Sequence, residues 1–314
     1  MKYDKMFKNS RLFPKVKYIL YNIPTIYYFG DKHPQPCRQP AAIYNIASQE
    51  ILESLNNAIE IFETYNINNN INIELFFNNL IEKCEKVIGN ICSFYDECFL
   101  IFISISKPST DNPIIASDWL KINGYDSGSL FKNYSYEAIE IWQKINNRLK
   151  HNNQKISYFL ATENINHVEG FYIEGYTKDN SIAPDPTFHN KENKMSQGIS
   201  FKKFFKEVFL SYFYISDNLL KVLEHHLKKN YSYKLDFKID VKDNDDLIKK
   251  VWDKLSDIDY IYFPDEYKIK YSRIVKYRIS YPHKSVIFNP RSMEIKVKFS
   301  GDGVTKNFQL PMIK

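Results

Sequence analysis

Apolar residues recur at three- and four-residue steps over four stretches of this sequence, and this pattern restricts the possible folds more than any other feature. The longest stretch covers about residues 73–105, and shorter ones cover 41–65, 135–151 and 200–229. Such spacing places the apolar side chains on one face of an α-helix. Since one-sided helices must bury these faces against one another, we expect an antiparallel helical bundle across residues 41–229.

Two β-rich runs follow the third helical stretch. They cover residues 156–162 and 167–176, and the short polar sequence ENIN separates them, which is typical of a β-hairpin. Residues 177–199 are polar and rich in turn-forming residues, so we expect a loop there. Residues 1–40 are basic and repeatedly interrupted by proline, which favours an extended arm or an irregular packing layer.

Residues 231–314 follow a different pattern. Strict alternation of apolar residues over 235–241 predicts a strand, and a helical pattern follows over about 245–255. Further strands are expected at residues 258–263, 273–281, 285–289, 293–300 and 304–310, with Gly301 and Gly303 in a hairpin turn before the last. The expected fold class is α+β: a mainly helical bundle with an inserted β-hairpin at 156–176, followed by a small basic α+β domain.

The composition indicates a globular chain rather than a disordered or membrane-spanning one. Of its 314 residues, 44% are hydrophobic and 25% are charged. We find no run of about 18 uncharged apolar residues and no apolar signal-peptide core, so we expect a cytoplasmic protein without membrane association. The cysteines at 37, 84, 92 and 98 lack CxxC spacing and are interpreted as reduced core thiols. The sequence predicts neither a cofactor nor a bound metal.

The helical stretch at 135–151 ends in a polar cluster, with Ser135 as its expected N-cap. On a helical wheel its apolar face contains Ala138, Ile141, Trp142, Ile145 and Leu149, whereas the side turned away contains Lys144, Arg148 and His151. An arginine beside polar amides can hold a phosphate, and imidazole can transfer a proton near neutral pH. The candidate catalytic residues are therefore Asn147, Arg148 and His151. The alternative is a solvated helix end with a Glu140–Lys144 pair.

A helical bundle with an Asn, Arg and His cluster late on one helix resembles the HEPN superfamily. The resemblance covers at most residues 41–229, and its motif residues are Asn147, Arg148 and His151. That family includes metal-independent ribonucleases of toxin-antitoxin, abortive-infection and CRISPR systems, and also non-catalytic binding modules. Its members usually pair so that two Arg and His motifs form one RNA-cleaving cleft, which implies a homodimer. The family motif places the His roughly four to six residues beyond the Arg, whereas only Leu149 and Lys150 separate Arg148 from His151.

Most of the net positive charge lies at the C-terminal end. Residues 267–314 contain 11 Lys or Arg and 2 Asp or Glu, a difference of +9, whereas the whole chain carries +6. On strands, alternation of cations with aromatic rings can place cations on one face for phosphates. The candidate nucleic-acid-binding residues are Lys268, Lys270, Arg273, Lys276, Arg278 and Lys296. The alternative is an ordinary solvated lysine face.

Two further sets of residues are weaker candidates. Asp185, His189 and His167 can supply carboxylate and imidazole to a metal, or be solvated loop residues. Asp265, Glu294 and Lys296 superficially resemble the PD-(D/E)xK nuclease pattern, which binds Mg²⁺, but this combination is also expected by chance in a chain rich in Glu and Lys.

Two classes of function remain open. As an enzyme, the chain is expected to be a metal-independent ribonuclease of a bacterial toxin or anti-phage defence system, acting on RNA rather than DNA. As a binding protein, it is expected to be a non-catalytic dimerisation or docking subunit of a multi-protein complex, with the basic domain contacting nucleic acid. The partner is then a second copy of the chain or another protein.

Overall fold

The computed structural model describes most of the chain. The described residues are 4–6, 14–67, 72–109, 115–151, 154–163, 166–176, 182–189, 198–235, 246–258, 263, 266, 273–275, 278–280, 292–301 and 304–313. The protein is α+β and dominated by helices, as the sequence predicts.

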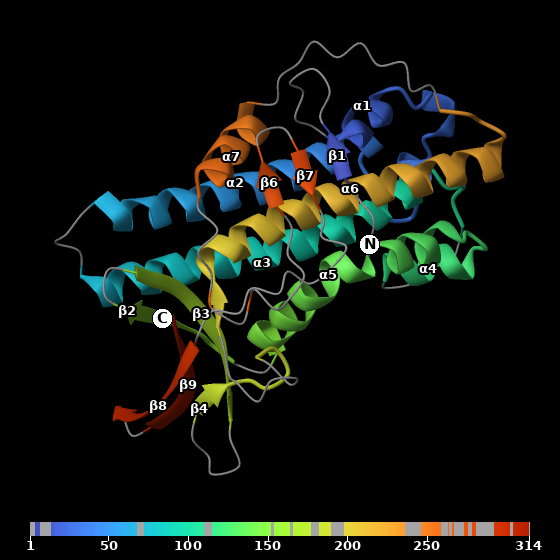
Figure 1. Cartoon of the computed structure of the whole chain (residues 1–314). Coiled ribbons are helices and arrows are strands. Elements are labelled where there is room, and N and C mark those ends of the chain that lie inside the picture. Colours follow the sequence, from blue (N-terminus) through green and yellow to red (C-terminus); the bar gives the residue numbers. More distant parts are fainter. Residues whose placement is uncertain are drawn as a thin grey trace.

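Four long helices form the body of the molecule (Figure 1). They are α2 (Pro40–Ile67), α3 (Ile73–Ser104), α5 (Ser127–His151) and α6 (Phe201–Tyr231). Helices α2 and α3 form a long helical hairpin, and α5 packs against α3 and α6. The predicted helical bundle is confirmed, and its four helices occupy the four stretches of apolar periodicity.

Helix α5 starts eight residues before its predicted start, at Ser127 instead of Ser135. Ser135 is fully buried inside the helix, so its predicted role as N-cap is wrong. The additional turns form because Phe131 extends the apolar face. Its ring stacks on Tyr95 at a centroid distance of 5.4 Å and meets Phe99 edge to face at 5.1 Å. Tertiary packing therefore extends a helix beyond its strongest local signal.

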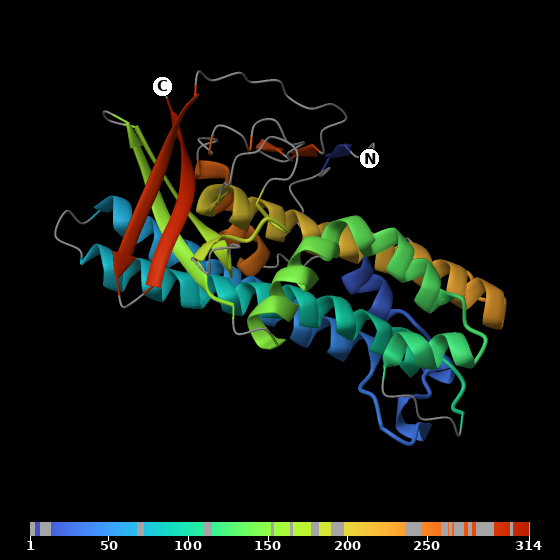
Figure 2. The same cartoon turned by 90° about the horizontal axis from the view of Figure 1, so that it is seen from below.

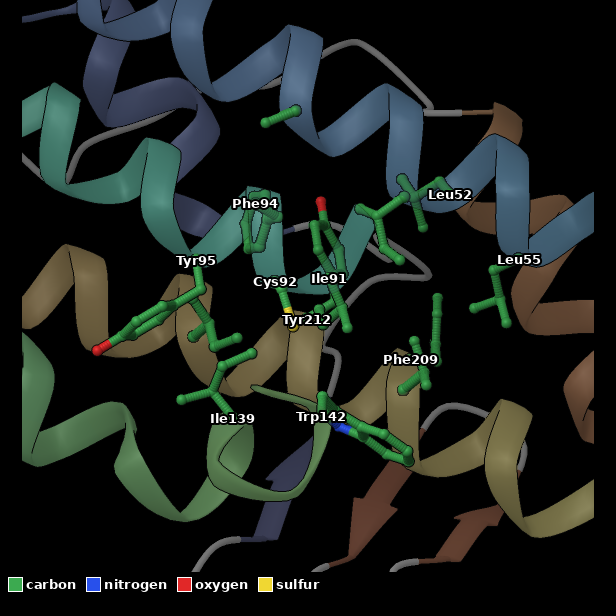
Figure 3. Packing of buried hydrophobic residues seen from close by; sticks show 14 of the residues in the cluster. Leu52, Leu55, Ile91, Cys92, Phe94, Tyr95, Ile139, Trp142, Phe209 and Tyr212 are labelled. Carbon is green, nitrogen blue, oxygen red and sulfur yellow. The ribbon is translucent and has the colours of Figure 1, made fainter. Parts of the chain in front are cut away.

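The core of the bundle is rich in aromatic rings contributed by all four long helices. Figure 3 shows aromatic residues of α3, α5 and α6 together with Leu52 and Leu55 of α2. It also contains a small group of buried hydroxyls between α2 and α6. Tyr44 Oη lies 2.9 Å from Ser216 Oγ, and Ser48 Oγ lies 2.7 Å from Tyr212 Oη. Because buried hydroxyls must find partners, these pairs favour one alignment of α2 against α6.

Helix α3 is the described helix whose length and composition would allow it to cross a membrane. Of its most apolar 18-residue window, 67% is buried inside the bundle. Its Cys84, Cys92 and Cys98 are free thiols buried in this packing. A central helix of a globular core has this composition, so the structure is compatible with a soluble protein.

The predicted N-terminal arm forms a packing layer that includes short helices. Helix α1 (Lys15–Tyr21) buries Val16, Ile19 and Leu20 and packs against α2 and α6. Two 3₁₀ turns, η2 (Thr25–Tyr27) and η3 (Gly30–Lys32), connect it to α2. A further helix missing from the prediction, α4 (Ala116–Ile122), precedes α5.

The predicted hairpin is confirmed as β2 (Ile156–Glu163) and β3 (Asn166–Tyr176). It packs across the end of the bundle where α3 and α6 begin, as Figure 2 shows. Tyr158 of β2 stacks on Phe77 of α3 at 4.7 Å, and Phe171 of β3 lies 5.5 Å from Phe201 of α6. The hairpin therefore closes one end of the core.

The segment 177–199 contains two short strands, so describing all of it as a loop was wrong. They are β4 (Ile182–Pro184) and β5 (Ile199–Ser200), and both pair with β3 in antiparallel orientation. These strands are too short for an alternation of apolar and polar residues to be recognised in the sequence. They form because the outer edge of β3 has backbone groups that require partners.

The C-terminal region adds one helix and two hairpins. Helix α7 (Asp246–Asp257) packs on α2, and its position matches the prediction. The last two strands, β8 (Ser292–Gly301) and β9 (Val304–Ile313), form the predicted hairpin. The predicted single strand at 273–281 is instead β6 (Arg273–Val275) paired with β7 (Arg278–Ser280), which also pairs with β1 (Asp4–Met6).

Strand β9 joins the inserted hairpin through β4, with Ile182 opposite Lys306 in parallel pairing. The resulting sheet has the order β2-β3-β4-β9-β8, with β5 also paired to β3. The described C-terminal elements thus contact the bundle and its hairpin. Whether the chain divides into folding units near residue 230 stays a prediction. Most of the strands expected at 235–241 and 258–263, and all of that at 285–289, lie outside the described residues.

Candidate functional site at the end of helix α5

The inner face of helix α5 is anchored firmly in the core. Ile139, Trp142 and Ile145 are buried, and the Trp142 indole donates a hydrogen bond of 3.1 Å from Nε1 to Ser211 Oγ of α6. Figure 3 shows Trp142 and Ile139 pointing toward α3 and α6. Ile141 is 37% exposed, so its predicted place on the apolar face was wrong. The buried face of α5, which packs against α3 and α6, contains Ile139 instead.

The three candidate catalytic residues lie in the last two turns of α5. Asn147 and His151 are exposed, and Arg148 is half-buried. Lys150 adds another cation, and its charge partly offsets the effect of burial, which raises the pKa of Asp96 on α3. Cations at this end of a helix are favoured by the helix dipole. The end of α5 therefore presents an amide, an imidazole and a guanidinium on a firmly held element.

Asp185 lies beside this cluster in the turn that follows β4. It is 6% exposed; its Oδ1 accepts a hydrogen bond of 2.8 Å from the Thr187 amide, and its Oδ2 accepts one of 3.1 Å from Gln154 Nε2. Burial alone would raise the pKa of Asp185. The hydrogen bonds and the positive charge of Arg148 outweigh burial, so this pKa is below its ordinary value. Asp185 is therefore a buried anion that the positive charge of Arg148 stabilises.

His189 also belongs to the turn that follows β4 and is only 3% exposed. Its Nε2 accepts a hydrogen bond of 2.7 Å from the backbone amide of Ile173 on β3. That nitrogen therefore carries no proton, and the ring serves as the hydrogen-bond acceptor for a backbone amide of β3. The prediction that Asp185 and His189 are either metal ligands or solvated loop residues is corrected, since both are buried and hydrogen-bonded.

A glycine allows this turn to lie against β3. A Cβ atom at Gly175 would be 2.9 Å from both the Cα and the Cβ of Asp185, closer than real Cβ atoms approach. The amide of Asp185 donates a hydrogen bond of 2.8 Å to the Ile173 carbonyl. Asp185 therefore occupies a fixed position set by backbone contacts, not only by its side chain.

The structure thus joins two residue sets that the sequence left separate. Figure 1 shows the end of α5 lying near β4, and the charge of Arg148 acts on Asp185 of the following turn. Gln154, the residue that connects them, was not singled out in the sequence because a single polar residue after a helix is unremarkable. Among the residues that the structure describes, no three His, Cys, Asp or Glu side chains gather as for a metal ion.

The candidate nucleic-acid-binding residues are placed only in part. Arg273 lies on β6, Arg278 on β7 and Lys296 on β8, in two different sheets. Lys268, Lys270 and Lys276 lie outside the described residues. Their joint role as a phosphate-binding surface stays a prediction.

The nuclease-like set is also only partly placed. Glu294 and Lys296 are two residues apart on β8 and so share one face of that strand, whereas Asp265 lies outside the described residues.

Replacing Asp185 by asparagine is expected to lower the free energy of unfolding by about 1–3 kcal/mol, because a buried carboxylate that accepts hydrogen bonds from Thr187 and Gln154 is lost. Urea denaturation at neutral pH measures the change. The control is Glu140→Gln, which removes an ion pair with the exposed Lys144 and should leave stability nearly unchanged. Equal effects of the two substitutions would show that the contacts of Asp185 contribute little.

Comparison with models of known protein families, with characterised proteins and with solved structures finds no match to this chain. Any function must therefore be argued from the chemistry of these side chains and from where the fold places them.

Proposed function

We propose that this protein is a cytoplasmic, metal-independent ribonuclease of the HEPN-like type, an effector of toxin or anti-phage defence systems. The observation that supports this is the placement of Asn147, Arg148 and His151. They form a polar set at the solvent end of a helix whose opposite face is fixed in the core by Trp142 and Ile145. A site on a rigid element can keep its geometry while a flexible substrate binds.

Each residue has a chemical role in this proposal. Arg148 binds the phosphate of the bond to be cleaved; its five N–H donors suffice for a phosphate and for Asp185 together. His151 takes the proton from a ribose 2′-hydroxyl, whose oxygen then bonds to phosphorus. The bond from phosphorus to the 5′-oxygen breaks, and that oxygen receives a proton from an imidazolium. Asn147 orients the phosphate.

The reaction needs one imidazole that accepts a proton and another that donates one. A single copy of the cluster has one candidate, His151, on the described end of α5. A homodimer that places two α5 ends together would supply both. The basic residues of the segment 267–314 would hold the RNA backbone in this assembly, so that binding should weaken steeply as salt is added.

The test is RNA cleavage by His151→Ala under single-turnover conditions. We expect the rate to fall by about 10²–10⁴-fold, the usual contribution of an acid or base, without a change in melting temperature, because His151 is exposed. Lys144→Ala on the same helix is the matched control and should retain full activity. Cleavage should also survive EDTA. Unchanged cleavage by His151→Ala, or its loss with EDTA, would refute the mechanism, and the latter would favour the Asp265, Glu294 and Lys296 set.

A second candidate function is supported by the influence of Arg148 on Asp185, whose pKa its positive charge lowers. An arginine whose charge already acts on a buried carboxylate can be structural, which favours a non-catalytic docking subunit. In that case the purified protein should bind RNA in a salt-dependent manner or form a stable dimer, yet cleave nothing. Binding measured at several salt concentrations, together with sedimentation, distinguishes this function from the first.

A further inference from the structure

A cavity of about 380 Å³ opens between the segment before α2 and the helices α2 and α3. Its walls include the apolar side chains of Ile43, Ala47 and Leu100, and its polar groups include Arg38, Glu50 and Glu97. This volume lies within the range of about 300–1,000 Å³ that is usual for small-molecule sites. None of these residues belongs to the cluster at the end of α5.

Hydrogen bonds fix the wall of the cavity that the N-terminal segment forms. The Tyr28 hydroxyl donates to the Cys37 carbonyl at 2.6 Å, and the Cys37 amide donates to the Gly30 carbonyl at 2.9 Å. The Phe29 amide donates to the Ser104 carbonyl at the end of α3, at 2.8 Å. A Cβ atom at Gly30 would lie 2.5 Å from the Cys37 carbonyl oxygen, so the segment is closely folded on itself. The cavity is therefore formed before any ligand enters, which reduces the ordering cost of binding.

The polar side of the cavity carries more negative than positive charge. Glu50 on α2 and Glu97 on α3 contribute two carboxylates, and Arg38 contributes one cation. Within the described part of the chain, neither carboxylate makes a hydrogen bond or a salt bridge. Burial raises the pKa of Glu97, the charges of Glu50 and Asp96 raise it further, and Arg38 only partly offsets them. A positive charge placed here would relieve this repulsion.

We infer that this cavity binds a small organic monocation, with its ammonium group between Glu50 and Glu97 and its alkyl part against Ile43, Ala47 and Leu100. An ammonium has three donors and can bond both carboxylates at once. An alkyl chain would remove apolar wall area from water at about 25 cal/mol per Å². A metal ion fits less well, because Ile43, Ala47 and Leu100 offer it no oxygen ligand.

The test is calorimetric titration of the full chain with n-butylammonium. We expect saturable binding of one molecule per chain, and no saturable binding of n-butanol, which has the same alkyl part without the charge. Glu97→Gln and Glu50→Gln should each weaken binding about tenfold or more, because a charge-assisted hydrogen bond is lost. Glu53→Gln is the matched control, since Glu53 is an exposed residue of α2 that bonds to Gln49.

Three results would overturn the inference. The first is no saturable binding of n-butylammonium, the second is equal binding of n-butanol, and the third is unchanged affinity in both Glu97→Gln and Glu50→Gln. Melting temperatures of the variants show that they are folded. Both substitutions remove repulsion, so the fold should not be weakened. Because RNA cleavage is measured separately, failure here and failure of the ribonuclease proposal are distinguishable.

Discussion

Replacing Trp142 by alanine is expected to lower the free energy of unfolding by about 3–5 kcal/mol, the usual cost of removing a buried Trp side chain. Trp142 is 4% exposed and meets Phe204 edge to face at 5.5 Å. Its indole Nε1 also donates to Ser211 Oγ, so the substitution leaves both a cavity and a buried hydroxyl without this donor. Urea denaturation followed by circular dichroism measures the loss.

Ile141 provides a control on the same turn of the helix. The sequence pattern places Ile141 and Trp142 on one apolar face, but Ile141 is 37% exposed in the structure. Ile141→Ala should therefore cost about 1 kcal/mol or less. Similar losses of stability for the two variants would contradict the burial of Trp142 and the exposure of Ile141. If Trp142→Ala unfolds the protein while His151→Ala leaves it folded, the two faces of α5 have separate roles.

Acid is expected to destabilise the protein by about 3 kcal/mol through a single buried residue, His226 on α6. Its ring is fully buried, with Nδ1 3.1 Å from Ser127 Oγ and Nε2 3.5 Å from Ser106 Oγ. The Tyr125 ring lies 5.3 Å from it. Burial lowers the pKa of His226 from 6.5 to about 4, although a backbone hydrogen bond with Ile105 and the charge of Asp126 act in the opposite direction.

The direction of this effect follows from which state binds the proton. Above pH 6.5 His226 is neutral in both the folded and the unfolded chain, so it adds no pH dependence. Between pH 6.5 and about 4 mainly the unfolded chain binds the proton, and stability falls as the pH falls. Below about pH 4 both states are protonated and the loss is complete. The pKa difference of about 2.5, at about 1.36 kcal/mol per pKa unit, gives the expected 3 kcal/mol.

The variant His226→Gln isolates this contribution from that of other acid-sensitive groups. Its stability at neutral pH should be lower than that of the unmodified chain, but the difference should shrink by about 3 kcal/mol as the pH is lowered to 4. His225→Gln, at the exposed neighbouring position, should retain the acid sensitivity. If His226→Gln loses stability with acid as steeply as the unmodified chain, the assigned role of His226 is wrong.

The helices could be predicted because their signal is local. Apolar residues at three- and four-residue steps identified α2, α3 and α6 within a few residues, and alternation identified β2, β3, β8 and β9. The errors arose where local signals were weak. Serine often caps helices, which favours Ser135 as an N-cap, whereas Phe131 packs into the core and the helix continues through Ser135. The short strands β4 and β5 have too few residues to show the two-residue alternation of apolar side chains that identifies a strand.

The candidate site could be predicted only in part. The exposure of His151 follows from the helical wheel, whereas Arg148, which the wheel places on the same side, is half-buried. The catalytic roles of Asn147, Arg148 and His151 remain predictions. Asp185 and His189 are expected in a polar loop, but the Asp185 amide and the His189 ring form hydrogen bonds with the backbone of Ile173, so the segment lies on β3 and both side chains are buried. The sequence carries no signal for the charges gathered around the cavity of Arg38, Glu50 and Glu97, since these residues belong to an arm and two different helices.

The sequence by itself determined the long helices and the longer strands, because helical and strand periods are properties of neighbouring residues. Only the tertiary structure decided which segments meet. Residues far apart in the chain, such as Ile182 with Lys306, Gln154 with Asp185 and Glu50 with Glu97, approach one another through packing and edge pairing. These contacts depend on shape and hydrogen-bonding partners across the whole core, for which a local sequence pattern carries no signal.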